Sequence, residues 1–246
     1  MTAVVVGLAL VGVAAAVSVR WHLGIGRQLG TAAVRAVVQL LLVALVIGAI
    51  FEHTGAAGLF VLAMLLVAAW TASRRMAAVP YGLAVGLVSI GGAAAVTLTA
   101  LFLADAFPFT PRYVIPTAGI VIGGAMSCVS LVGIRLADDL VDKRSDIEAR
   151  LSLGASVRQA LGPWSKRAVV SSLVPAMDQT KNVGLVSLPG AFVGMLLGGA
   201  SPMEAAQVQL SVLLALLGTE ALAAVLAVAG IVRLVTLPGE RLRSLV

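Results

Sequence analysis

Seven apolar stretches, each long enough or nearly long enough to cross a bilayer, constrain this chain more than any other feature. They cover residues 3–19, 33–51, 58–72, 82–104, 113–134, 183–200 and 208–232. A transmembrane helix needs about 20 apolar residues, with a tolerance of roughly 17–25. The alternating segments of a transmembrane barrel, about ten residues each, are absent from the sequence. We therefore predict an all-α, polytopic membrane protein with about seven spans.

The composition supports the same class. Hydrophobic residues make up 60% of the chain and charged residues 11%, whereas a soluble domain carries roughly 25% charged residues. Glycine is abundant, at 26 residues, and small residues let helices approach closely in lipid. We expect one transmembrane domain over residues 1–246, located in the cell membrane and surrounded by lipid.

The basic residues predict the orientation. Cytoplasmic loops of membrane proteins are enriched in Lys and Arg. If the loop after the first span is cytoplasmic, only Arg112 of the 17 Lys and Arg residues falls on the outer side. The N-terminus is therefore expected outside and the C-terminus in the cytoplasm. Because the net charge of +6 is spread over short loops, no nucleic-acid partner is expected.

Residues 135–181 form the only long segment between spans and are expected to be a cytoplasmic loop. Mixed charges from Asp138 to Glu148 indicate a helix that continues the fifth span into solvent. Gly154 is expected to end a helix. Ser156 followed by Gln159 has the pattern of a capping box that opens the next helix. Residues 148–159, here called the knob, are thus predicted to form a rigid protrusion suited to moving with another protein.

After the knob, residues 168–177 are apolar but too short to span a bilayer, and Pro175 interrupts them. We expect an interfacial or re-entrant helix there, which leads into the sixth span. The motif in the knob consists of Glu148-Ala149 followed by Leu153-Gly154-Ala155-Ser156. It resembles the cytoplasmic loop with which ABC transporter permeases contact their ATPase.

A wider resemblance covers about residues 35–209. There the chain is similar to the FetB-type permeases, membrane subunits of bacterial iron-export ABC transporters that are related to plant aluminium-tolerance membrane subunits. The shared motifs include Arg35-Ala-x-x-Gln39-Leu, Ile115-Pro116-x-Ala118-Gly119 and Leu151-Ser152-Leu153-Gly154-Ala155. The most specific motif is Pro175-x-x-Asp178-x-x-Lys181-x-Val183-Gly184-Leu185-Val186-Ser187-Leu188-Pro189-Gly190.

The resemblance implies a transport subunit of an ATP-driven exporter for iron or a related metal ion, and not an enzyme. The sequence has no Gly-x-x-x-x-Gly-Lys-Ser/Thr phosphate loop. We therefore expect no cofactor on this chain, and ATP-Mg on a separate cytoplasmic ABC ATPase subunit. Two permease copies are expected to face each other as a homodimer. The residues expected to couple to the ATPase are Glu148, Ala149, Leu153, Gly154, Ala155 and Ser156.

Two positions depart from the family. The family often has Gly-Asn-Ala-Met where this chain has Gly123-Gly124-Ala125-Met126, so a polar contact at position 124 is missing. Glu220 lies in the middle of the seventh span, where the resemblance implies a small or apolar residue. An uncompensated charge at that depth costs roughly 2.5–3.5 kcal/mol, so Glu220 is expected to face the bundle interior. Contact with a substrate or proton and an interhelical hydrogen bond both remain open as its role.

Other candidates for the translocation path are polar residues and helix breakers. Arg35 and Gln39 are four residues apart, on one face of the second span, although Arg35 could also reach the headgroups. Asp178 and Lys181 are expected at the cytoplasmic entry of the sixth span, where a local ion pair is the simpler interpretation. Within that span a gating kink is expected at Pro189 and Gly190, and Ser187 is a further candidate for the translocation path.

No set of residues has the spacing of a metal site, so the metal ligands stay unknown. Cys128, the single cysteine, is interpreted as a small core residue. Two other functions stay open. The chain could be an ABC permease for an organic solute such as a sugar nucleotide. It could also be a self-sufficient secondary transporter or channel, with Glu220 as the coupling carboxylate and no need for an ATPase.

Overall fold

The computed structural model describes residues 2–51 and 54–243, and the chain forms two compact units, Met1–Thr54 and Gly55–Val246. Six helices in the described ranges are long and apolar enough to cross a membrane. They are α1 (Thr2–Arg20), α2 (Gly26–Phe51), α3 (Thr54–Arg75), α4 (Gly82–Leu103), α5 (Pro111–Asp142) and α9 (Pro202–Val235). The predicted all-α, multi-pass membrane class is therefore confirmed.

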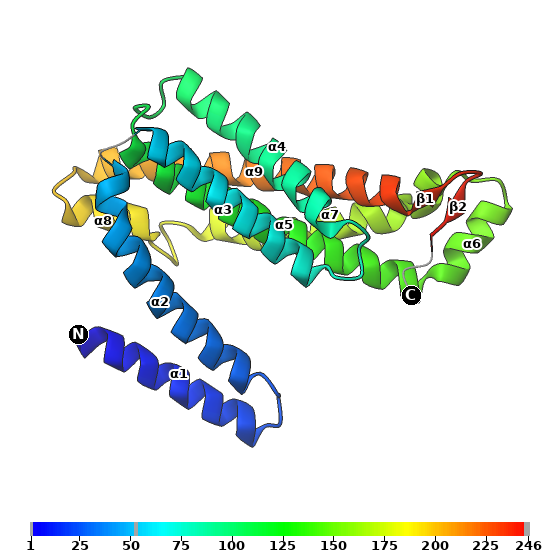
Figure 1. The fold of residues 1–246 in the computed structure, drawn as a ribbon, viewed down its shortest axis with the longest axis horizontal. Helices are drawn as coiled ribbons and strands as arrows, with labels where there is room; N and C mark the ends of the chain where they lie inside the picture. The colour runs from blue at the N-terminus through cyan, green and yellow to red at the C-terminus, as the bar shows by residue number, and fades with distance from the viewer. Residues whose placement is uncertain (1, 52–53, 244–246) are drawn as a thin grey trace. The chain divides into compact units, whose positions relative to one another are not determined.

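The first unit is a hairpin of α1 and α2 (Figure 1). Its turn is held by Ser18, whose buried Oγ accepts a hydrogen bond from the Ile25 N–H at 3.2 Å. Most apolar side chains of both helices are exposed within the chain. That distribution is typical of helices whose surroundings are lipid, because no hydrophobic force drives such side chains together in a bilayer.

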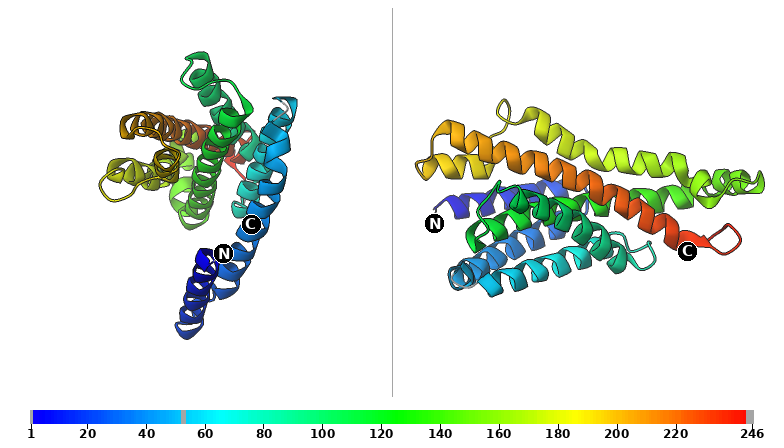
Figure 2. Two further views of the ribbon diagram at one scale, coloured as in Figure 1. Left: turned by 90° about the vertical axis from the view of Figure 1, so that its left-hand side faces the viewer. Right: turned by 90° about the horizontal axis from the view of Figure 1, so that it is seen from above.

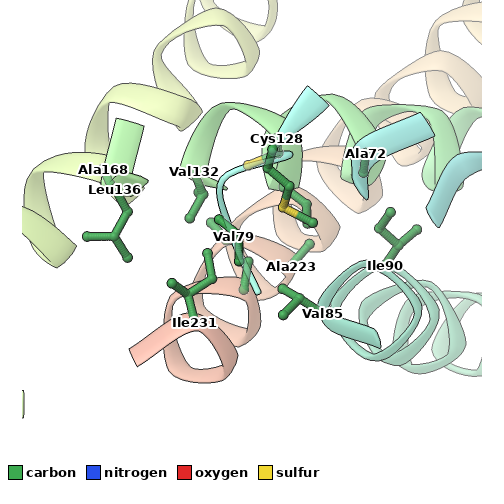
Figure 3. Packing of buried hydrophobic residues seen from close by; sticks show 14 of the residues in the cluster. Ala72, Val79, Val85, Ile90, Cys128, Val132, Leu136, Ala168, Ala223 and Ile231 are labelled. Atoms are coloured by element: carbon green, nitrogen blue, oxygen red, sulfur yellow. The ribbon is translucent and has the colours of Figure 1, made fainter. Parts of the chain in front are cut away.

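The second unit is built around the two longest helices, α5 and α9. The helix α7 (Val157–Asn182) runs beside both of them, and α4 packs against both as well (Figures 1 and 2). Small side chains dominate the contact surface, where Ala118, Ala125 and Ala223 are fully buried. Figure 3 shows Cys128 and Val132 of α5 facing Ala223 and Ile231 of α9 across this core. Close packing of α5, α7 and α9 therefore positions the side chains described below.

The expected sixth span over residues 183–200 is wrong. The helix α7 continues without interruption through residues 168–177 to Asn182, so these residues belong to a longer helix that begins in the knob. The chain then turns at Gly184, whose φ of +82° favours glycine, and its N–H donates to the Ser187 carbonyl at 2.9 Å. A helix of eight residues, α8 (Gly190–Leu197), follows with Pro189 at its N-cap. Hydropathy misled here because it registers apolar side chains and not backbone angles.

The loop after α5 also differs in one detail from the expectation. The mixed-charge helix is not continuous, because α5 ends at Asp142 and a separate helix, α6 (Arg144–Ser152), begins after Lys143. Beyond α9, the strands β1 (Thr236–Leu237) and β2 (Arg241–Leu242) pair as an antiparallel hairpin that the sequence did not predict. Both α6 and this hairpin lie at the same end of the second unit (Figure 1).

Candidate functional site

A cavity of about 330 Å³ lies between α5, α7 and α9, near the middle of α9. We call it the Glu220 cavity. Most of its wall is apolar or glycine, and none of its lining residues is Lys, Arg or His. Its polar lining consists of Ser127, Cys128, Ser172, Gln179 and Glu220. A cavity with a single carboxylate and no basic residue in its lining is suited to a cation rather than to an anion.

Glu220 is the only acidic residue of this lining, and it is 9% exposed. Its burial agrees with the expectation that it faces the bundle interior. Within residues 2–51 and 54–243, no group donates a hydrogen bond to its carboxylate, which borders the cavity. The structure therefore offers no interhelical hydrogen bond from this side chain, which was one of the two roles left open by the sequence.

Gly124 makes room for that carboxylate. A Cβ added at Gly124 would lie 2.5 Å from Oε1 of Glu220, far inside van der Waals contact. The same addition at the neighbouring Gly123 would meet nothing within 4 Å, although Gly123 also lines the cavity. Positions 124 and 220, where the sequence was expected to depart from the resemblance, therefore meet at one point in the fold. Sequence reasoning treated them separately, and only the packing of α5 against α9 joins them.

Cys128 links the three helices around the cavity. It is 2% exposed, and its Sγ is 3.4 Å both from Oγ of Ser172 on α7 and from the backbone carbonyl oxygen of Glu220 on α9. It belongs to the core, as expected, and it also lines the cavity. Sequence reasoning did not single out Ser172 or Gln179, because a polar residue on a mixed helix such as α7 gives no signal by itself.

The knob has the local structure that the sequence predicts. Gly154 adopts a φ of +88°, and its N–H donates to the Leu151 carbonyl while the Ala155 N–H donates to the Arg150 carbonyl. This pair of bonds is the Schellman motif that ends a helix. The capping box is confirmed as well, since Ser156 and Gln159 each cap the other's backbone N–H. At the turn between the helices, Leu153 is 89% exposed, which makes it available to a partner.

The base of the knob is anchored firmly to the bundle. Ile147, Val157 and Leu161 are fully buried there, and the Arg150 guanidinium lies 5.2 Å from the ring centroid of Trp164. The Val157 N–H, which has no partner within its own helix, donates to Oε2 of Glu240 at 2.6 Å. Sequence reasoning missed Glu240, since nothing in the local pattern pairs it with a residue so distant in the chain.

The remaining candidates are not among the residues that line the Glu220 cavity. Arg35 and Gln39 are exposed residues one turn apart on α2, in the first unit. Asp178 and Lys181 are exposed in the last turns of α7, and the structure shows no ion pair between them in the part of the chain it describes. The helix α7 begins at Val157 in the knob and ends at Asn182, so Asp178 and Lys181 lie at the other end of this helix from the knob.

Ser187, Pro189 and Gly190 lie at the break between α7 and α8, and not at a kink within one helix. Pro189 borders a second, more apolar pocket, where Oε1 of Gln209 is buried without a hydrogen-bond partner. Over residues 2–51 and 54–243, no three His, Cys, Asp or Glu side chains are grouped as a metal site.

Comparison with known proteins gives consistent matches over most of the chain. The family described as "Uncharacterised protein family (UPF0014)" matches residues 1–236. The Oryza sativa "UPF0014 membrane protein STAR2" is 38% identical over 224 residues, which are 90% of this chain and 79% of that protein. The Arabidopsis thaliana "Protein ALUMINUM SENSITIVE 3" is 43% identical over 186 residues, 75% of this chain and 68% of that protein.

The name of one bacterial relative refers to transport. The Escherichia coli "Probable iron export permease protein FetB" is 33% identical over 222 residues, which are 89% of this chain and 86% of that protein. No solved structure matches the chain.

Proposed function

The chain belongs to the UPF0014 family, and from this premise we propose that it is the transmembrane permease subunit of an ATP-driven ABC exporter of iron or a related metal ion. The name of the Escherichia coli relative supports the iron assignment. The observation that carries the ATP-driven part is the knob, a rigid and well-anchored protrusion with an exposed leucine at its turn. ATP-Mg is then bound by a separate cytoplasmic ATPase, and this chain catalyses no reaction itself.

The connections of the knob support a mechanism of alternating access. Its second helix is the beginning of α7, and Glu240 joins that helix to the hairpin that follows α9. Both α7 and α9 also form walls of the Glu220 cavity. A displacement of the knob by a closing pair of ATPases would therefore move two cavity walls relative to α5. Packed helices switch between discrete arrangements rather than deform continuously, which suits an inward-facing and an outward-facing state of a permease homodimer in the cell membrane.

One observation favours a second candidate, a secondary transporter that needs no ATPase. The buried carboxylate of Glu220 has no hydrogen-bonding partner in the described residues, and such a group can exchange a proton for a substrate ion. In a secondary transporter the knob would have no ATPase to contact. This candidate and an ABC permease for an organic solute are outcomes of the tests below.

The experiment targets Gly154. Valine at this position must adopt a φ of +88°, which a β-branched residue strongly resists, so the turn of the knob should rearrange. The matched control is Gly162→Ala on α7, where an added Cβ meets nothing and no unusual φ is required. We expect both variants to insert in the membrane. Only Gly154→Val should lose co-purification with a cognate ABC ATPase and lose ATP-dependent export of iron.

Normal ATPase binding and export by Gly154→Val would overturn the coupling role of the knob. Export that continues without any ATPase would instead establish the secondary transporter. Export of an organic solute by the intact complex, with iron tolerance unchanged when the gene is deleted, would replace the metal substrate.

A further inference from the structure

The Glu220 cavity contains a carboxylate without a protein partner, and an unpaired charge in the membrane interior is unfavourable in free energy. The Glu220 side chain is nine-tenths buried and borders the cavity, which has no basic lining residue. A charge in the membrane interior is normally paired with another protein group. Here the described residues supply no such partner. A cation that enters the cavity would balance the charge of the ionised carboxylate.

A second potential ligand lines the same cavity. The Sγ of Cys128 is 3.4 Å from the backbone carbonyl oxygen of Glu220, and the thiol and the carboxylate both border the cavity. A thiolate and a carboxylate together carry the charge that neutralises one divalent cation. Sulfur ligands favour transition metals over Mg²⁺ and Ca²⁺, which prefer oxygen ligands only. The pair therefore selects a class of cation as well as a charge.

A neutral oxygen donor is also close. Oγ of Ser172 is 3.4 Å from Sγ of Cys128 and lines the same cavity. This atom comes from α7, whereas the thiol comes from α5 and the carboxylate from α9. A cation held here would join three helices, and movement of α7 or α9 would pull its ligands apart.

We propose that the Glu220 cavity binds one divalent transition-metal cation, with Glu220 and Cys128 as its two anionic ligands and Gly124 as the residue that leaves space for the carboxylate. This inference rests on the proposed function, because it names the place where the exported metal is held. On binding, the metal–sulfur bond replaces the S–H bond, and the thiol proton leaves to solvent. Only two strong ligands hold the ion, and a transported ion must bind weakly enough to leave.

The single cysteine makes the test unambiguous. Cys128 is the only thiol in the chain, so a thiolate-to-metal charge-transfer band in the ultraviolet spectrum can arise only at this residue. The purified full-length protein, without a histidine tag, is titrated with Co²⁺ and with Cd²⁺, and Mg²⁺ serves as the oxygen-preferring comparison. We expect a saturable band with Co²⁺ and Cd²⁺, accompanied by proton release, and no competition from Mg²⁺.

Four variants locate the site. Cys128→Ser should abolish the band, and Glu220→Gln should weaken the apparent affinity on the order of tenfold or more. Gly124→Ala should weaken it similarly, because its Cβ meets the flexible ends of Glu220 and Leu216 and displaces the carboxylate without touching backbone. Gly123→Ala, on the same helix and with open space around its Cβ, should bind as the unmodified protein does. Thermal unfolding checks that each variant is folded.

The inference is overturned if the folded protein gives no band, or if Glu220→Gln and Gly124→Ala bind as tightly as the unmodified protein. These outcomes are separate from failure of the proposed function. Co-purification with the ATPase and ATP-dependent iron export, measured on the same variants, decide that question. Export that survives in both Glu220→Gln and Cys128→Ser would leave the exporter in place and remove this site from it.

Discussion

The knob and the Glu220 cavity both belong to the second unit, and they differ in whether their polar groups have hydrogen-bonding partners. In the knob, the helix end at Gly154, the capping box at Ser156 and the N–H of Val157 all have hydrogen-bonding partners. In the cavity, the described residues leave the carboxylate of Glu220 without one. The knob lies at the end of the bundle, whereas the cavity lies near the middle of α9.

This difference separates polar groups that stabilise the fold from a polar group that does not. Each helix cap stabilises a protein by about 0.5–2 kcal/mol, so the paired groups of the knob add to its rigidity. An unpaired charge at mid-membrane depth instead costs roughly 2.5–3.5 kcal/mol. A rigid knob can transmit force, and a carboxylate held without a partner can receive a cation. Substitutions in the cavity should therefore reduce transport without reducing stability, whereas substitutions in the knob should reduce both.

The largest expected effect is on transport, at the cavity. Glu220→Gln removes the charge and keeps the size of the side chain, so we expect export to fall on the order of tenfold or more while the thermal unfolding temperature does not fall. Glu220→Leu should also leave stability intact, because no hydrogen bond of this side chain is lost among the described residues. Export rates and thermal unfolding in detergent measure both effects. A marked loss of stability in Glu220→Leu would show that Glu220 stabilises the fold, and the contrast between the cavity and the knob would then be wrong.

An intermediate effect is expected at Glu240, on the knob side. Glu240→Ala removes the acceptor for the Val157 N–H, and we expect a local loss of about 1 kcal/mol, within the range for helix caps. Hydrogen exchange at the first turn of α7 should quicken, and ATPase coupling should weaken. Glu240→Gln keeps an oxygen acceptor and should recover most of the protection. Unchanged exchange at Val157 in Glu240→Ala would show that the hairpin does not hold the knob.

The smallest effect is expected at the two capping boxes, which form a matched pair. Ser156 caps α7 in the knob, and Ser201 caps α9 through the same arrangement with Glu204. Replacing either serine with Ala should destabilise its own helix end by about 1 kcal/mol, seen as faster hydrogen exchange there. Only Ser156→Ala should also reduce ATP-dependent export. Equal reductions of export in both variants would mean that general stability, and not the knob, explains the effect.

The sequence by itself determined what depends on composition and on neighbours within one helical turn. Long apolar stretches require helices in a membrane, so the all-α class followed from hydropathy. The helix end at Gly154 and the capping box of Ser156 with Gln159 were also predicted, because their partners are three to five residues away. The same hydropathy misplaced the sixth span, where a positive φ at Gly184 and the proline at 189 end the helical path.

Only the tertiary structure decided which distant residues meet. Cys128 lies 44 residues from Ser172, and Val157 lies 83 residues from Glu240. Helical periodicity can place Gly124 and Glu220 each on an inward face, but it does not say that these two faces touch. That contact depends on how α5 and α9 pack along their lengths, and therefore on many side chains at once. The cavity could for this reason be located in the folded chain and not in its sequence.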